Sequence, residues 1–198
     1  MQAPWRTRLA AGDDTNALIQ LINSAYRGES SRQGWTTEAD LLGGQRTDAR
    51  EITELLADST GCFLLADAVT PIDDASGSTA DSLLGCLHLK HDQAAVWIGM
   101  FAIRPGQQGN GLGSRLLREA EAHSLAVWQP RCWRMAVISN RAELLAYYAR
   151  RGYHDTGERL PFPDDIRFGL PKVDHLCFNV IEKPCPADAD SHHASDAP

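Results

Sequence analysis

The chain has 198 residues, of which 43% are hydrophobic and 23% charged, which is typical of one globular domain. Its formal net charge of −7 argues against binding to nucleic acid or to an anionic membrane surface, and it suits a cationic partner better. No apolar run approaches the ~20 residues of a membrane span, and Met1–Leu9 contains no apolar signal segment, so we expect a cytoplasmic protein without a membrane anchor.

The cysteines indicate a reducing environment and no metal site. The chain has 5 of them, scattered and without a C-x-x-C pair, namely Cys62, Cys86, Cys132, Cys177 and Cys185. An odd number at irregular spacing favours neither a disulfide framework nor a zinc site. We interpret His192 and His193, in the acidic C-terminal tail, as incidental rather than as metal ligands.

The first third of the chain predicts a strand at Trp5–Ala10 and then an amphipathic helix. Asp13, Asp14 and Thr15 offer an N-cap, and apolar residues follow at helical spacing, namely Leu18, Leu21, Ile22 and Ala25. We expect Arg27–Thr36 to be a polar loop. Two short helical segments are predicted next, at Thr36–Leu42 and Asp48–Ala57, separated by Gly43 and Gly44.

The remaining two thirds alternate between strands and helices. In chain order we expect a strand at Cys62–Ala68, an exposed connection at Thr70–Ser82, strands at Leu83–Lys90 and Ala95–Ile103, a helix from about Leu112, a strand at Cys132–Ile138, a helix capped by Asn140 and ending at Gly152, and strands at Tyr153–Glu158 and Leu176–Glu182. This order indicates one mixed α/β domain over residues 1–183. Residues 184–198 lack hydrophobic content and are predicted to be disordered.

The richest segment is Phe101–Leu117, in which a strand leads into a glycine-dense turn and the turn opens a helix. Gly109, Gly111 and Gly113 allow the backbone to bend sharply and to approach a ligand closely. Free N–H groups in the first helical turn, together with the helix dipole, form an anion site. Nearby arginines offer further phosphate contacts, namely Arg104, Arg115 and Arg118. We therefore predict a phosphate-binding loop.

Two common nucleotide-binding patterns do not fit this loop. A P-loop requires a lysine after its last glycine, and no lysine follows Gly113. A Rossmann fingerprint requires a third glycine where Ser114 stands and an acidic residue ~20 positions later, which Arg131–Arg134 does not supply. The pattern [QR]-x-x-G-x-[GA], in contrast, matches Gln108–Gly113 in full.

This match resembles the cofactor motif of the GNAT acyltransferase superfamily. The segment Asn140–Tyr153 is similar to the second cofactor motif of that family, a helix with a tyrosine, here Tyr148, four residues before Gly152. The resemblance covers roughly Trp5–Lys183. It implies the GNAT fold, an α/β (α+β type) architecture with a mixed, mostly antiparallel central sheet flanked by helices.

The resemblance implies acetyl-CoA as the co-substrate and an amine as the acceptor. The backbone of Phe101, Ala102 and Ile103 would hold the pantetheine arm, with the Phe101 N–H directed at the thioester oxygen. The loop residues that would hold the pyrophosphate are Gln108, Gly109, Asn110, Gly111, Leu112, Gly113 and Ser114. Asn140 is placed near the cofactor, or serves only as a helix cap.

Tyr148 is the candidate general acid, because a phenol with a pKa of ~10 can protonate a leaving thiolate. Tyr147 is the adjacent alternative, and a core aromatic role for Tyr148 stays open. The general base is not evident, because Trp97 stands where some family members carry a glutamate. Weak candidates are Glu38, Asp40, His88 and His175, with ordered water as a further option.

The segment Arg27–Leu42, called the early loop below, is the expected acceptor side. Arg27 would bind a substrate carboxylate and Glu38 the amine, with Trp35 beside them, unless this is only a surface loop with Trp35 packed onto the core. The leading hypothesis is acetylation of a small-molecule amine. Acetylation of a protein N-terminus or lysine, and a non-catalytic acyl-CoA sensor, are the alternatives. Many relatives dimerise, so a homodimer is implied as an option.

Overall fold

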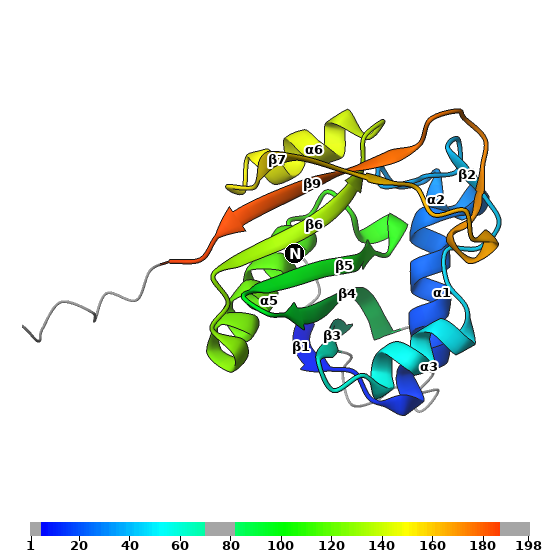
Figure 1. The fold of residues 1–198 in the computed structure, drawn as a ribbon. Helices are drawn as coiled ribbons and strands as arrows, with labels where there is room; N and C mark the ends of the chain where they lie inside the picture. Colours follow the sequence, from blue (N-terminus) through cyan, green and yellow to red (C-terminus); the bar gives the residue numbers. More distant parts are fainter. Residues whose placement is uncertain (1–4, 70–81, 187–198) are drawn as a thin grey trace, which may run out of the picture.

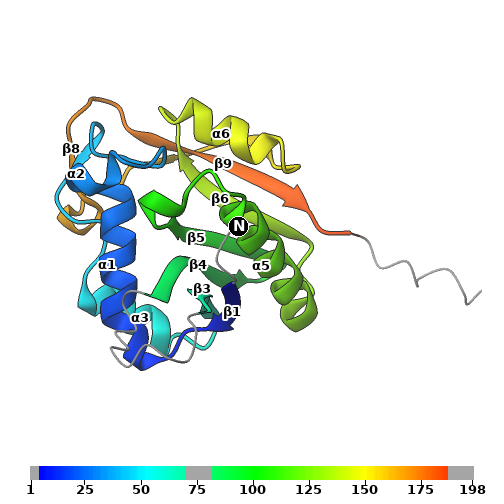
Figure 2. The same cartoon turned by 180° about the vertical axis from the view of Figure 1, so that it is seen from behind.

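The computed structural model describes residues 5–69 and 82–186, and it is drawn in two views in Figures 1 and 2. The predicted exposed connection at Thr70–Ser82 and the predicted C-terminal tail lie almost entirely outside these residues. The elements are β1 (Trp5–Leu9), η1 (Gly12–Asp14), α1 (Thr15–Tyr26), α2 (Gly28–Ser31), β2 (Leu42–Gly43), α3 (Ala49–Ala57), β3 (Gly61–Ala68), β4 (Leu83–Asp92), β5 (Ala95–Ile103), η2 (Pro105–Gln107), α5 (Leu112–Trp128), β6 (Cys132–Ile138), α6 (Ala142–Ala149), β7 (His154–Pro161), η3 (Ile166–Phe168), β8 (Leu170–Pro171) and β9 (Cys177–Pro184).

A seven-stranded sheet in the order β1-β3-β4-β5-β6-β9-β7 forms the centre of the domain. Every neighbouring pair is antiparallel except β5 and β6, which run parallel. This is the mixed, mostly antiparallel sheet flanked by helices that the sequence predicts.

Helices cover both faces of the sheet, because successive side chains along a central strand are apolar and point alternately to the two faces. On β3, Phe63 and Leu65 pack with the buried residues of α1 and α3, whereas Leu64 and Ala66 pack in the cluster that holds α5. Successive side chains of a strand point to opposite faces, so a strand covered on both sides is apolar throughout. Figures 1 and 2 show α1 and α3 separated from α5 by the strands.

The centre of the sheet opens where β5 and β6 diverge. These two strands pair only from Ala95–Trp97 to Cys132–Arg134, although both continue beyond. On its other side β5 carries an irregularity, because Met100 has a left-handed φ of 45° and the β4–β5 register shifts between Cys86 and His88. Both distortions place Phe101 at a point where the regular ladder is interrupted.

Several sequence predictions are wrong at the level of local structure. The predicted polar loop at Arg27–Thr36 contains the helix α2 (Gly28–Ser31). Residues 36–42 are turns leading into β2, not a helix, because the Thr37 hydroxyl accepts from the Ala39 N–H at 3.2 Å and β2 pairs with β8. Asn140 does not cap α6, whose N-cap is Arg141 with no side-chain capping bond. The sheet also extends past residue 183, since β9 ends at Pro184 and the Cys185 N–H bonds the Arg131 carbonyl.

None of the helices in the described ranges has both the length and the apolar character of a membrane span.

Candidate active site

A cleft of about 600 Å³ lies where β5 and β6 diverge, and the end of α1, the loop after α2, the glycine loop and α6 contribute to its walls. Its lining residues are Tyr26, Trp35, Thr36, Phe101, Ile103, Gln108, Gly109, Gly111, Gly113, Ser114, Glu143, Leu144, Tyr147, Tyr148, Arg150 and Arg151. The structure therefore brings the two predicted cofactor motifs, far apart in the sequence, to one cavity.

The glycine loop has the backbone geometry of an anion site. Gly111 is the N-cap of α5 with a φ of 80°, and Gly109 has a φ of 83°. A Cβ added to either glycine would meet no atom within 4 Å, so the space beside the loop is open to a ligand. Left-handed glycines before a helix aim its free N–H groups outward. This cradle fits a pyrophosphate.

The Gln108 side chain has a structural task. Its amide nitrogen donates to the Thr36 hydroxyl at 2.9 Å and to the Ile103 carbonyl at 3.0 Å, and its oxygen accepts from the Trp35 N–H at 2.9 Å. Gly34 allows this approach, because a Cβ there would lie 2.6 Å from the Gln108 amide oxygen. Gln108 thus ties the early loop to the phosphate loop, and its backbone N–H is engaged as well, because it donates to the Pro105 carbonyl at 3.3 Å.

Beside the start of α5 lies Arg151, a cation that the sequence motifs did not indicate. Arg151 donates to the Ser114 hydroxyl at 2.5 Å and lies over the Tyr147 ring, 3.4 Å from its centroid. Two of the three arginines that were expected near phosphate have other partners, whereas Arg118 lies beside Ser114 and Arg151. Arg104 binds the Leu83 carbonyl, and Arg115 pairs with Glu119 and stacks on Trp5.

The other predicted cofactor residues differ in their exposure. Ala102 and Leu112 are buried in the hydrophobic core. Asn110 and Asn140 are exposed and do not line the cleft. Any contact that Ala102 and Leu112 make with a ligand would come from their backbone.

A second cavity of about 120 Å³ adjoins the cleft and is lined by residues of both β5 and β6. The two cavities share Tyr26, Phe101, Leu144 and Tyr148. Tyr148 is only 5% exposed, and burial raises its pKa well above the ordinary value, so the phenol keeps its proton at physiological pH. The Tyr26 hydroxyl donates to the Phe101 carbonyl at 2.7 Å and fixes the irregular part of β5.

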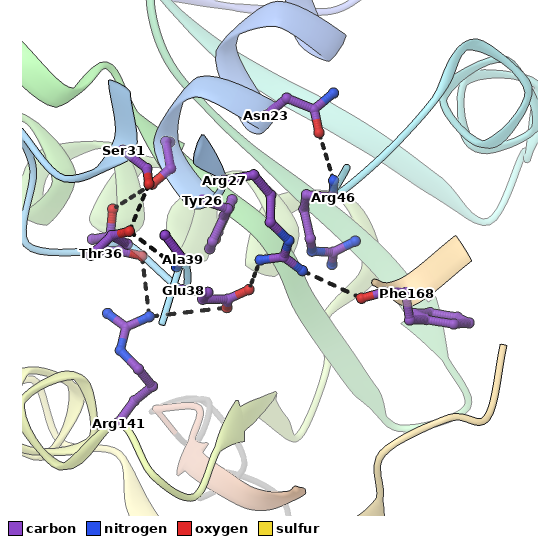
Figure 3. Close-up of polar contacts among 12 residues, drawn as sticks. Asn23, Tyr26, Arg27, Ser31, Thr36, Glu38, Ala39, Arg46, Arg141 and Phe168 are labelled. Atoms are coloured by element: carbon purple, nitrogen blue, oxygen red, sulfur yellow. Dashed lines mark hydrogen bonds and ion pairs between the residues drawn. The ribbon is translucent and has the colours of Figure 1, made fainter. Parts of the chain in front are cut away.

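The predicted acceptor residues divide between the two cavities. Arg27 and Glu38 line the smaller one, where they form a buried ion pair with each other (Figure 3). Trp35 lines the large cleft instead, with its ring centroid 5.2 Å from that of Tyr147. Arg46 and Arg141 also line the smaller cavity, and nothing in the local sequence indicated them.

Most candidate bases lie away from both cavities. His88 is buried against Phe63, with ring centroids 4.7 Å apart, and burial lowers its pKa to about 4. His175 is exposed, and Asp40 pairs with Arg32 on the surface. Of the four, only Glu38 lines a cavity. Trp97, at the glutamate position of some relatives, carries the Arg134 guanidinium 5.6 Å from its ring centroid.

The strand order, the divergence of β5 from β6 and the glycine turn before α5 define the GNAT fold. Residues 62–155 match the family model described as an acetyltransferase (GNAT) domain. Over these residues the chain carries a GNAT acetyltransferase domain, as the sequence motifs predict.

Solved GNAT structures share the fold over almost the whole chain. NAA60 from Arabidopsis thaliana, solved with acetyl-CoA, is 14% identical, with 91% of this chain and 98% of that chain covered and a TM-score of 0.65. The ribosomal-protein-S18-alanine N-acetyltransferase from Escherichia coli is 11% identical, with coverage of 95% and 98% and a TM-score of 0.64. The spermidine/spermine N-acetyltransferase SpeG from Vibrio cholerae is 12% identical, with coverage of 91% and 92% and a TM-score of 0.59. Among curated protein sequences, none matches this chain significantly.

Proposed function

We propose that this protein transfers the acetyl group of acetyl-CoA to the primary amine of a small molecule, by direct attack. The observation that carries the proposal is the junction of the two cavities. The large cleft has the phosphate cradle, the smaller cavity has space for an acceptor, and Phe101 and Tyr148 belong to both. A reaction between two substrates requires such a meeting point.

The cofactor side assigns a role to each segment. Backbone N–H groups from Gly109 to Ser114 hold the pyrophosphate at the start of α5. The Gln108 N–H, which the sequence also assigned to this group, donates to the Pro105 carbonyl instead. The interrupted ladder at Phe101 leaves room for the pantetheine arm along Phe101–Ile103, in the manner of an added strand. Acetyl-CoA supplies the thioester carbonyl that the amine attacks.

The remaining chemistry falls to two groups of this chain. As the amine nitrogen bonds to the carbonyl carbon, the Phe101 N–H stabilises the negative charge on the carbonyl oxygen. When the carbon–sulfur bond breaks, Tyr148 gives its proton to the thiolate. The amine nitrogen loses one proton to water. Water returns one proton to the Tyr148 phenolate, so the enzyme is regenerated. Glu38 remains the candidate that orients the amine.

Protein acetylation is the second candidate, and it is favoured by the likeness to structures named as alanine N-acetyltransferase and NAA60. The small volume of the acceptor cavity, about 120 Å³, favours a small molecule instead. A non-catalytic acyl-CoA sensor would not require the second cavity at all.

The experiment is a screen of amines with acetyl-CoA, in which released thiol reports turnover. The panel contains amino acids, polyamines, and peptides with a free N-terminus or a lysine. The proposal predicts thiol release with at least one small amine, at a rate well above the hydrolysis measured without an acceptor. Turnover with peptides alone would replace it by the second candidate, and no turnover despite coenzyme A binding would favour the sensor.

A further inference from the structure

The acceptor cavity carries more positive than negative charge. Its charged lining consists of Arg27, Arg46 and Arg141 against a single carboxylate, Glu38. This local balance is opposite to the net charge of −7 of the whole chain. A cavity of this sign attracts an anion and repels a polycation, because charges at close range in a partly buried site are weakly screened.

Two of the three arginines are already neutralised. Arg27 pairs with Glu38, and it also donates to the Phe168 carbonyl at 3.3 Å. Arg141 pairs with Glu143 at 3.0 Å, lies 4.0 Å from Glu38, and binds the carbonyls of Trp35 and Thr36. These bonds close the early loop onto α6 and build the cavity wall (Figure 3).

Arg46 is different from the other two. Its Nη1 atom is buried and has no hydrogen-bond partner, and no carboxylate among the described residues lies within ion-pair distance. Its guanidinium carbon lies over the Tyr26 ring, 5.9 Å from the ring centroid. The Arg46 backbone is held in place, because its N–H donates to the Asn23 side chain at 2.6 Å.

A second buried guanidinium nitrogen of this cavity also lacks an acceptor. The Nε atom of Arg27, a residue only 6% exposed, is also buried without a partner. Figure 3 shows the guanidinium groups of Arg27 and Arg46 on the same side of Glu38. Buried guanidinium nitrogens without acceptors are costly, so a ligand that supplies the acceptor gains the difference.

We infer that the acceptor is a carboxylated amine, such as a free amino acid, and that Arg46, assisted by Arg27, binds its carboxylate. This inference rests on the proposed function and names its substrate class. A planar carboxylate matches the fork of donors that a guanidinium presents. Arg46 is therefore a specificity-determining residue, placed next to Tyr26 at the junction of the two cavities.

The test compares amino acids with their own carboxamides, which have nearly the same shape but lack the negative charge. The wild type is expected to prefer the acids by about 10- to 100-fold in kcat/KM, the range of one charge-assisted hydrogen bond. Arg46→Gln should reduce this preference to about 2-fold or less without changing KM for acetyl-CoA. Arg46→Lys should keep part of the preference, because the charge remains.

Arg50→Gln is the matched control, since it removes the same charge from the exposed face of α3, where Arg50 pairs with Glu54. It should leave the preference for acids unchanged. Equal rates with acids and carboxamides in the wild type, a preference for polyamines, or an unchanged preference in Arg46→Gln would overturn the inference.

A binding measurement separates the inference from the proposed function. Calorimetry with N-acetylglycine, added to the protein saturated with coenzyme A, reads the carboxylate site without turnover. Binding that is lost in Arg46→Gln supports the site even if no amine is acetylated. Absence of binding in the wild type contradicts the site even if the amine screen succeeds.

Discussion

At the scale of single residues, the proposed chemistry depends on a tyrosine whose burial disfavours ionisation. Tyr148 is buried between the two cavities, with Tyr26 and Tyr147 as neighbours, and its surroundings disfavour a phenolate. A raised pKa means that the group is protonated across the whole physiological range. In the proposed mechanism Tyr148 is therefore protonated and able to donate, and its own ionisation does not limit the rate at physiological pH.

Replacing Tyr148 with phenylalanine tests this role. Tyr148→Phe removes the donor and little else, so kcat should fall by about 10²- to 10⁴-fold, the usual contribution of general acid catalysis. The shift in melting temperature caused by coenzyme A should be unchanged. Tyr147→Phe is the control, because Tyr147 lines only the large cleft, and it should lose far less activity. An unimpaired Tyr148→Phe would show that another group protonates the thiolate.

At the scale of elements, the early loop and the glycine loop are built as one unit. Gln108 bonds Trp35, Thr36 and Ile103, and Arg141 closes the same loop onto α6. The sequence predicts the glycine turn and α5 because their signals are local. It does not predict this unit, and it misplaces a helix at residues 36–42, because the deciding bonds join segments far apart in the chain.

Gly34→Ala probes this connection. The new Cβ would lie 2.6 Å from the Gln108 amide oxygen, so that side chain must move and lose hydrogen bonds. We expect the free energy of unfolding to fall by about 1–2 kcal/mol and KM for acetyl-CoA to rise. Gly106→Ala, where a Cβ meets no atom within 4 Å, should change neither. Equal effects of the two substitutions would show that Gln108 does not organise the loops.

On β4, His88 makes the fold sensitive to acid. Burial, with a smaller effect of Lys90, lowers its pKa to about 4, compared with an ordinary 6.5 in the unfolded chain. The unfolded state therefore takes up a proton first as the pH falls below 6.5. The contribution of neutral His88 is complete above pH 6.5 and is lost progressively down to about pH 4.

Denaturant titrations between pH 7 and pH 4 measure this effect. The wild type should lose more free energy of unfolding over that range than His88→Leu, by up to about 1.4 kcal/mol per pH unit. His154→Leu replaces an exposed histidine on β7, and this control should lose as much free energy of unfolding over that range as the wild type. Parallel curves for the wild type and His88→Leu would contradict the assignment.

At the scale of the whole molecule, the divergence of β5 from β6 determines where the proposed cofactor and acceptor sites adjoin. The sequence motifs predicted the fold, because it depends on short patterns with a known geometry. They also pointed to the glycine loop and Tyr148, which line one cleft, and the roles of both stay predictions. The acceptor side was predicted less well. Arg27 and Glu38 were expected to act separately on the substrate, yet they pair with each other, and Arg46 gave no signal, because pairing and burial depend on tertiary contacts.

The most direct test of the account is the thermal stabilisation of the protein by coenzyme A, measured for the wild type and two glycine variants. At a concentration about 100 times its dissociation constant, coenzyme A should stabilise the wild type by about 2.7 kcal/mol, or roughly 5–10 °C. Gly111→Glu should abolish the shift, because it places charge and bulk against the pyrophosphate. Gly157→Glu matches it in backbone strain, with a φ of 83° and open space, but lies on β7 outside both cavities, so it should keep the shift. A wild type that coenzyme A does not stabilise, or a Gly111→Glu variant that it stabilises as well as the wild type, would contradict the assignment of this loop.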